Sequence, residues 1–326
     1  MDLVEFEELA NLVADDRVTD VLVVGGAGVW ADCGDGLVDA GIALGEARTR
    51  ELATRLVATG GRHVDETTPI ADVRHGDGVR VHVVLAPVAV RGTAISIRLP
   101  RVERPTLDDL ERTGTFDRVG RDTVAAAVRE RRNVLVSGAT GSGKTTLLAA
   151  MLALVPHDER IVTVEDVAEL RIDHPHVVAL EARQANTEGA GALGLDRLVR
   201  EALRMRPDRL VVGECRGAEV RELMSALNTG HDGGAGTLHA NGIEDVPARL
   251  EALGALAGLD PPALARQAVS AFDLVLHVER RRGVRRVAAA GRLVIDPAGR
   301  LAVASAVRQS GTRVAPVGGR GRARHG

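Results

Sequence analysis

Residues 138–145 carry the residue types and the spacing that phosphate chemistry needs. They match the pattern G-x-x-x-x-G-K-[ST], between an apolar run at 134–136 and a helical run from Thr146. Glycines let backbone N–H groups turn inward around phosphate oxygens, and the start of a helix adds its dipole. Lys144 is expected to reach the β- and γ-phosphates, and Thr145 to offer its hydroxyl to Mg²⁺. The nucleotide-binding residues predicted by this motif are Gly138, Ala139, Thr140, Gly141, Ser142, Gly143, Lys144, Thr145 and Thr146.

Lys144 is the single lysine among the 42 basic residues of this 326-residue chain. Arginine serves every other basic position, yet this loop has an ammonium group, which is compact enough to fit between phosphates and backbone N–H groups. Guanine-specific GTPases read their base with an Asn-Lys-x-Asp segment, and no second lysine exists to form one. The composition therefore favours ATP as the bound nucleotide.

The elements that must position this loop alternate in type. Helical segments separate the apolar runs, and the first helix, at 121–132, leads into the glycine loop. Such alternation predicts a mostly parallel sheet with helices on both faces, as in α/β folds. Ligands of open sheets of this kind bind at the carboxyl ends of the strands, where residues 138–145 would lie. The strands are expected at 133–137, 160–164, 177–180, 210–213, 235–238 and 274–278.

The first 100 residues predict a smaller domain of the α+β type. Runs rich in β-branched residues at 18–24 and 79–84, and the alternating segment 94–99, are typical of strands. Residues 46–59 have helical spacing and end at two glycines. The expected boundaries are an α+β domain at 1–100, a linker with a short helix capped by Thr106 and Asp109 at 101–120, a P-loop NTPase domain at 121–310 and a disordered basic tail at 311–326.

Composition excludes several classes of protein. The longest apolar run, 147–155, is too short to cross a bilayer, and the acidic N-terminus lacks the features of a signal peptide. Two cysteines form no disulfide framework, which fits a reducing cytoplasm. Three phenylalanines, one tryptophan, no tyrosine and a net charge of -3 offer bases little to stack on and give no overall attraction to nucleic acid. We expect a cytoplasmic protein that does not bind nucleic acid.

Three further segments make a resemblance to a known family specific. They are IVTVEDVAELRI at 161–172, RMRPDRLVVGECRGAE at 204–219 and ALNTGHDGGAGTLHANG at 226–242. In this order they resemble the Asp box, the Walker B segment and the His box of the type II/IV secretion ATPases. They are most similar to the tight-adherence (Tad/Flp) pilus branch, the CpaF-like ATPases. The resemblance implies that the P-loop domain is RecA-like and that the smaller domain precedes it.

Acidic residues in these boxes are candidates for the chemistry. Glu214 follows the apolar strand 210–213, where a carboxylate can bind Mg²⁺ or orient the attacking water. Glu165, Asp166 and Glu169 follow another apolar strand, and Glu165 is a second candidate for the metal. The resemblance implies that Glu169 is the general base and that Glu214 lies on the metal side, although the two roles could be exchanged. Either arrangement suits phosphoryl transfer, which depends mainly on positioning and charge neutralisation.

Histidines and arginines complete the set of candidates. His231 and His239 lie in a glycine-rich, neutral stretch, where an imidazole can donate to the γ-phosphate and register its loss. No cysteine or third histidine lies nearby at the spacing that zinc requires. Arg98 matches an arginine of the smaller domain that family members aim at the nucleotide. The other arginine candidates, as fingers or interface pairs, are Arg183, Arg204, Arg206 and Arg216.

The resemblance implies an Mg²⁺-dependent ATPase that assembles as a homo-oligomer, expected to be a hexamer, at the inner face of the cytoplasmic membrane. ATP hydrolysis would power pilus assembly or protein secretion through an inner-membrane platform protein. Two alternatives stay open: a nucleic-acid motor, such as a RecA-like helicase or conjugation ATPase, and a nucleotide-binding regulator without turnover. Scarce aromatic residues count against the first, and two acidic boxes count against the second.

Overall fold

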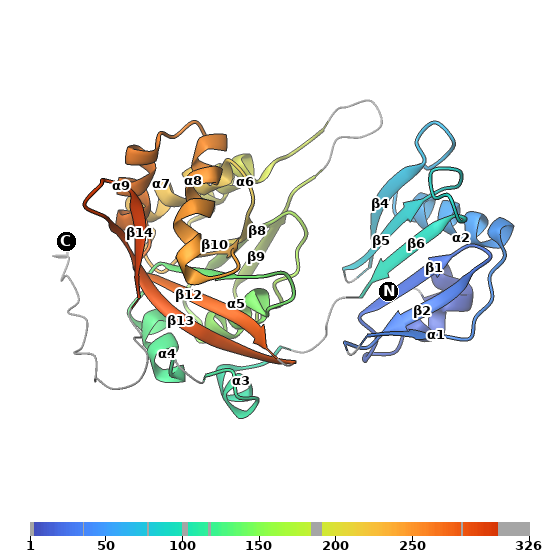
Figure 1. The fold of residues 1–326 in the computed structure, drawn as a ribbon, viewed down its shortest axis with the longest axis horizontal. Helices are drawn as coiled ribbons and strands as arrows, with labels where there is room; N and C mark the ends of the chain where they lie inside the picture. The colour runs from blue at the N-terminus through green and yellow to red at the C-terminus, as the bar shows by residue number, and fades with distance from the viewer. Residues whose placement is uncertain are drawn as a thin grey trace. The chain divides into compact units, whose positions relative to one another are not determined.

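The computed structural model describes residues 3–34, 36–76, 78–99, 104–116, 119–183, 191–281 and 283–305. The chain divides into two compact units, Met1–Glu103 (unit 1) and Arg104–Gly326 (unit 2), which Figure 1 shows as separate sheets with their own helices. The tail expected at 311–326 lies outside the described residues. Each unit has a hydrophobic core of its own.

Unit 1 is a six-stranded antiparallel sheet in the order β3-β2-β1-β6-β5-β4. Buried and more exposed residues alternate along its central strands, and the long helix α2 packs on the buried side through Leu52, Leu56 and Val57. Ile95 and Ile97 are both buried, which confirms that they share a face. The elements are η1 (Leu3–Leu9), α1 (Ala10–Val13), β1 (Asp20–Val24), β2 (Gly28–Asp32), β3 (Leu37–Asp39), α2 (Glu46–Thr59), β4 (Ile70–His75), β5 (Val79–Val84) and β6 (Ala94–Arg98).

Unit 2 is built on an eight-stranded sheet in the order β14-β13-β12-β7-β11-β10-β8-β9. Neighbours from β12 to β9 in this order are parallel, and β13 and β14 join antiparallel at one edge. The strands are β7 (Val134–Gly138), β8 (Ile161–Glu165), β9 (Val177–Glu181), β10 (Arg209–Cys215), β11 (Ala235–His239), β12 (Leu274–Arg281), β13 (Val284–Ile295) and β14 (Leu301–Ser305). The helices are α3 (Leu107–Arg112), α4 (Arg121–Arg129), α5 (Lys144–Leu152), α6 (Leu195–Ala202), η2 (Leu203–Met205), α7 (Glu219–Asn228), η3 (Ile243–Asp245), α8 (Val246–Leu256) and α9 (Pro261–Ala271).

Helices cover both faces of the unit 2 sheet, and the central strand β7 shows why. Its Val134 and Val136 pack with α3, α4 and α5, whereas Leu135 packs with α6 to α9. A strand that is buried on both faces needs an unbroken apolar run, which is the pattern of parallel strands. The predicted fold class, an α/β domain with a mostly parallel sheet behind a smaller α+β domain, is therefore confirmed.

The described part of the expected linker, residues 104–116 and 119–120, belongs to unit 2 and is packed against it. Thr106 and Asp109 form the capping box that the sequence predicts, with the Asp109 N–H donating to Thr106 Oγ1 at 3.2 Å. Leu107 and Leu110 are buried in the same core as α4 and α5. The expected short helix and its cap are present, and the apolar face of this helix packs into the core of unit 2.

Candidate nucleotide-binding site

The loop between β7 and α5 has the backbone shape that its glycines allow. Gly141 and Gly143 have φ of +71° and +102°, which side-chain-bearing residues rarely adopt. A Cβ on Gly138 would lie 2.3 Å from the carbonyl oxygen of Val278, so only glycine fits beside β12. The loop ends at the first turn of α5, where unpaired N–H groups and the helix dipole favour an anion.

Lys144 turns back over its own loop. Its Nζ donates to the carbonyl oxygens of Gly138 and Ala139, each at 3.0 Å, and lies 3.3 Å from Nδ1 of His239. The side chain is largely buried, and this burial lowers its pKa against the opposing effect of the Glu214 carboxylate. A buried ammonium with only carbonyl and imidazole partners lacks a full counter-charge at short range. Such a group is ready to exchange these partners for phosphate oxygens.

His239 links Lys144 to the carboxylate at the end of β10. Because Nδ1 faces an ammonium donor, the neutral ring must carry its proton on Nε2, which lies 2.7 Å from Oε1 of Glu214. Burial lowers the pKa of His239, and the charge of Lys144 acts in the same direction. The imidazole is therefore neutral near pH 7, with an N–H available on the Glu214 side.

Glu214 is held ionised by its neighbours. Burial raises its pKa, but the hydrogen bond from Arg216 and the charges of Arg216 and Lys144 outweigh this, and the pKa is lowered overall. Arg216 Nη2 donates to Glu214 Oε2 at 2.7 Å, and its Nη1 reaches Asp166 at 3.5 Å. Arg216 is thus in the site, where it bridges two acidic candidates.

Two polar atoms beside the loop are buried without completed hydrogen bonds. Among the described residues, Oε1 of Glu214 and Oγ of Ser142 have no hydrogen-bond partner, because the approach of His239 to Oε1 is close but poorly angled. Four other buried atoms among the described residues are also unsatisfied, so it is the position of these two beside the glycine loop that points to a ligand. A hydrated Mg²⁺ and a phosphate chain would supply a cation for Glu214 and acceptors for the loop. The residues present therefore fit ATP and Mg²⁺.

Glu165 and Glu169 are joined by the turn that follows β8. Oε1 of Glu165 accepts the N–H groups of Glu169 and Leu170, both at 3.1 Å. Burial raises the pKa of Glu165 to about 7, although these two hydrogen bonds act against the rise. Glu165 also lies against Gly213, where a Cβ would be 2.5 Å from its Cγ. Its carboxyl group thus shapes the turn, whereas the side chain of Glu169 is exposed.

Three of the predicted residues lie at the other edge of the same sheet. Strand β11 pairs with β7 from Ala235 to His239, so His239 lies at the carboxyl edge and His231 lies before the amino edge. There Nδ1 of His231 is 3.2 Å from the carbonyl oxygen of Ala226. We predicted that His231 and His239 lie together at the phosphates. Within one subunit this prediction is wrong, because the two histidines lie at opposite edges of the sheet. Arg204, 3.6 Å from Glu201, and the exposed Arg206 precede β10 at the same amino edge.

The remaining two arginines are not brought to the loop within the described contacts. Arg183 is exposed, and its Nε donates to the carbonyl oxygen of Gly191 at 2.7 Å. Arg98 lies in unit 1, at the end of β6, and donates to Asp20 at 3.1 Å.

Sequence reasoning missed a buried histidine next to the loop. His277 of β12 pairs with Ser137 of β7, and its Nδ1 lies 3.0 Å from Ser137 Oγ. Both side chains are buried on the sheet face that carries α7 to α9, and burial lowers the pKa of His277. The sequence signal that could have identified it is a single polar residue, His277, inside the apolar run LVLHV at 274–278. This residue pairs with Ser137, the last residue before the glycine loop.

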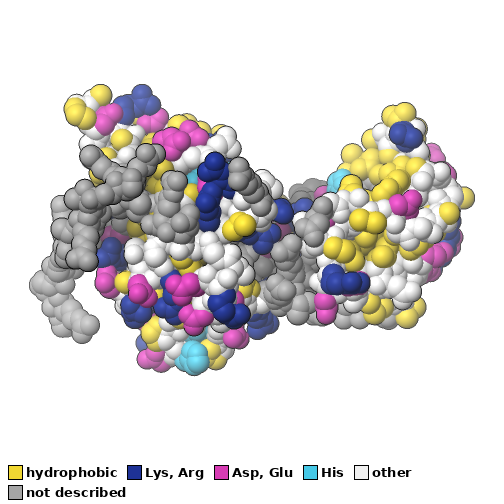
Figure 2. Space-filling view, turned by 60° about the horizontal axis from the view of Figure 1, so that its bottom comes forward, with side chains coloured by type: hydrophobic (Ala, Val, Ile, Leu, Met, Phe, Trp, Pro, Cys, Tyr) yellow, Lys and Arg dark blue, Asp and Glu magenta, His cyan; other side chains and the backbone are white. Residues whose placement is uncertain are grey.

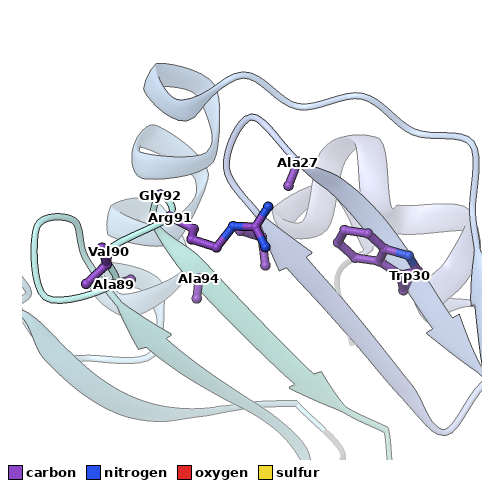
Figure 3. A pocket seen from close by; sticks show the side chains of 8 residues that line it. Ala27, Trp30, Ala89, Val90, Arg91, Gly92 and Ala94 are labelled. Carbon is purple, nitrogen blue, oxygen red and sulfur yellow. The ribbon is translucent and has the colours of Figure 1, made fainter.

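Unit 1 has a surface hollow of a different character. It measures about 510 Å³ and is lined by Val24, Ala27, Trp30, Ala89, Val90, Arg91, Gly92 and Ala94. In Figure 3 the guanidinium of Arg91 extends toward the indole of Trp30 and lies between Ala27 and Ala94, and Figure 2 shows hydrophobic side chains gathered over a face of this unit. No carboxylate or imidazole lines this hollow, so it offers no group for activating water.

Two searches over the described residues gave no result. No described helix has both the length and the apolar character needed to cross a membrane. No three His, Cys, Asp or Glu side chains in the described ranges are arranged to hold a metal ion. Mg²⁺ that binds with a nucleotide is usually held by phosphate oxygens together with one or two protein oxygens.

Comparisons with known proteins identify the family and the fold of the chain. Residues 6–313 match the profile of the family described as Type II/IV secretion system protein. A protein of Mycobacterium tuberculosis named for conjugal transfer is 51% identical over 285 residues, which cover 85% of this chain and 81% of that protein. The chain is similar in fold to the ATPase DotB of Legionella pneumophila, with a TM-score of 0.62 and 21% identity over 92% of this chain and 82% of the other.

A second solved structure of similar fold is the pilus retraction motor PilT with bound ADP. It gives a TM-score of 0.62 and 20% identity over 91% of this chain and 81% of that chain. Both structural likenesses concern the fold, whereas the profile match and the mycobacterial relative extend over most of the sequence. The chain therefore belongs to the type II/IV secretion system protein family.

Proposed function

We propose that this protein is an Mg²⁺-dependent ATPase that powers pilus assembly or protein secretion. The observation that carries the proposal is the chain of side chains from Lys144 through His239 to Glu214 at the mouth of the glycine loop, ending in a buried carboxylate oxygen without a hydrogen-bond partner. The names of DotB, an ATPase, and PilT, a pilus motor seen with ADP, support it. The more specific Tad/Flp branch remains part of the proposal.

Each residue has a role that its surroundings permit. Lys144 exchanges the carbonyl oxygens of its loop for phosphate oxygens, and Thr145 with Glu214 holds Mg²⁺. The metal, when bound, neutralises charge on the phosphates. Glu169, exposed on the turn after β8, takes the proton of the attacking water. His239, with its N–H on Nε2, can donate to the γ-phosphate and follow its departure.

Arg216 donates to Oε2 of Glu214 and leaves Oε1 available to Mg²⁺. Its guanidinium now bridges Glu214 and Asp166, and its side chain is 60% exposed, so it can move at low cost. After moving, it can stabilise the charge that develops on the phosphate, which is the function of an arginine finger. Arg98, Arg183, Arg204 and Arg206 remain candidates for fingers or interface pairs between subunits.

Two substitutions test the enzymatic proposal. Lys144→Ala should abolish both nucleotide binding and phosphate release, because no other lysine can replace the ammonium. Glu169→Gln should bind ATP but not turn it over, because the amide cannot accept the proton. Phosphate release and the binding of a fluorescent ATP analogue measure the two effects, and Arg17→Ala, at an exposed ion pair of unit 1, is the control. If both variants hydrolyse ATP at the wild-type rate, the site is misassigned.

Assembly and location belong to the same proposal. We expect a homo-hexamer that works at the inner face of the cytoplasmic membrane with a platform protein as partner. Light scattering during size-exclusion chromatography, with and without ATP, measures the oligomer. A monomer under all nucleotide conditions would contradict this part alone.

The mycobacterial relative is named for conjugal transfer, and so the alternative of a nucleic-acid motor can be tested directly. We expect that DNA leaves the rate of hydrolysis unchanged, because the aromatic side chains of unit 2 among the described residues, Phe116 and Phe272, pack against its cores and offer bases no stacking surface. Strong stimulation by DNA at physiological salt would favour the motor instead.

A further inference from the structure

The hairpin of β12 and β13 extends beyond the edge of the sheet at which the glycine loop lies. Strand β12 pairs with β7 as far as Val278, which is opposite Gly138, and then continues to Arg281. The chain turns and returns through β13, where Arg285 lies opposite Arg280. An arginine-rich strand pair is therefore fixed beside the phosphate loop by regular sheet pairing.

Arg285 lies directly over the end of the loop. A Cβ on Gly143 would be 2.9 Å from Cδ and 3.7 Å from Nε of Arg285. Gly143 is the residue before α5, so the stem of Arg285 covers the point at which the N–H groups of the first helical turn face outward. Glycine at position 143 thus serves two purposes: it adopts a φ of +102°, and it leaves room for this arginine.

The two faces of the hairpin differ in charge. Residues directly opposite each other in an antiparallel pair project to the same face, so Arg280 and Arg285 place two like charges on the face that meets the loop. On the other face Arg286 is opposite Glu279, and its Nε donates to that carboxylate at 2.7 Å. The opposite-charge pair is thus on the face away from the loop.

We propose that Arg285 is a nucleotide-binding residue whose guanidinium contacts the phosphate chain held by residues 138–145. The proposal rests on the proposed function and assigns to that site a contact outside its four sequence motifs. A guanidinium presents a planar fork of donors that matches phosphate oxygens, and charge-assisted bonds of this kind are stronger than neutral ones. Because the contact is made to the ground-state phosphates, its loss should raise KM and leave kcat nearly unchanged.

The test compares two glutamine variants of the full chain. Arg285→Gln should weaken the binding of a fluorescent ADP analogue about 10-fold or more, as expected for the loss of a charged hydrogen bond. Arg286→Gln removes the same charge from the same hairpin, on the face away from the loop, and should change the Kd less than about 2-fold. Steady-state hydrolysis should show the loss in KM. Wild-type binding by Arg285→Gln, or equal losses in both variants, would overturn the inference.

Controls separate this inference from the proposed function and from misfolding. If the wild-type chain binds no nucleotide, the proposed function fails; if it binds and Arg285→Gln binds equally well, only the inference fails. Should Arg285→Gln melt at a lower temperature, Arg285→Lys decides, because it keeps the stem and the charge but not the fork. An intermediate loss of affinity in Arg285→Lys supports the proposal, and unchanged affinity contradicts it.

Discussion

The two edges of the unit 2 sheet both carry charged and polar side chains, but these side chains are partnered in different ways. At the amino edge, Arg209 is 2% exposed, and all three of its nitrogens donate: to Glu159 at 2.6 Å, to Gly233 O at 3.4 Å and to Val128 O at 3.2 Å. Asn133 likewise uses its amide nitrogen and oxygen, which accepts the N–H groups of Gly233 and Gly234. At the carboxyl edge, Lys144 has no carboxylate within bonding distance among the described residues, and Glu214 has an unsatisfied oxygen.

The amino edge is not fully satisfied either, since Nε of Arg160 has no hydrogen-bond partner among the described residues, so the contrast is between Arg209 and Asn133 on one side and Lys144 and Glu214 on the other. Hydrogen bonds that the fold completes by itself stabilise the fold, and removing one partner leaves a buried group unsatisfied. Buried polar atoms without a hydrogen-bond partner in the folded chain cost stability. Proteins retain such atoms where a ligand supplies the missing partner. The amino edge should therefore respond to mutation in stability, and the carboxyl edge in activity.

The largest expected effect is on stability at the amino edge. Arg209→Ala should lower the free energy of unfolding by about 3–5 kcal/mol, because it leaves the half-buried Glu159 with only Arg131 as its ionic partner. Chemical denaturation measures the change, and Arg204→Ala, at an exposed pair, should cost less than about 0.5 kcal/mol. Equal effects of the two substitutions would remove the contrast between the edges.

At the carboxyl edge, Glu214→Gln should lower kcat by at least about 100-fold, since an amide cannot offset the charge of Mg²⁺. Its free energy of unfolding should fall by less than about 1 kcal/mol, because the charge of Glu214 is favoured in the folded state but its partner Arg216 is largely exposed. Turnover and a denaturation curve on the same preparation provide both values. A stability loss as large as that of Arg209→Ala would show that Glu214 is structural.

The third prediction concerns Glu165, whose effect on stability should depend on pH. Its pKa is raised from 4.5 to about 7 in the folded protein, so the folded state binds the proton more tightly than the unfolded state. Stability from this group is therefore present below pH 4.5 and is lost as the pH rises to about 7, at a cost of about 3 kcal/mol above that pH. Glu165→Gln should remove this loss and be the more stable form at pH 8. Parallel stability curves for wild type and variant between pH 5 and pH 8 would contradict the assignment.

The smallest effect is expected for His231, which lies at the edge of the sheet opposite the loop. His231→Ala should change kcat less than about 2-fold and cost about 1 kcal/mol for the contact with the Ala226 carbonyl. His239→Ala should lower kcat by about 10-fold or more, because His239 lies between Lys144 and Glu214. Comparable losses in kcat would place His231 in the site of a neighbouring subunit.

Local signals in the sequence were sufficient for the loop and the parallel strands. The apolar strand before Gly138, the glycines and the helical run after Lys144 are all contiguous, and the structure has each of them. The capping box of Thr106 and Asp109 was equally local. In each case the residues that decide the conformation lie within a few positions of one another.

The features that sequence reasoning missed depend on distant partners. Strand β13 contains arginine, alanine and glycine, and it forms because β12 and β14 pair with it on both sides. Arg209 is buried because Glu159 lies 50 positions away in the chain but next to it in space. Arg285 reaches Gly143 through the register of a hairpin whose own sequence indicates only a turn. The spacing of residues along the sequence does not predict which of these distant residues come into contact.

The position of Trp30 allows the unfolding of unit 1 to be followed by fluorescence. It is the single tryptophan of the chain, and it lines the hollow on unit 1, so unit 2 has no tryptophan at all. Tryptophan emission during heating therefore follows unit 1, whereas far-ultraviolet circular dichroism follows both units. Coincident midpoints would mean that the chain melts as one cooperative block, and separate midpoints would give each unit its own melting temperature without any label.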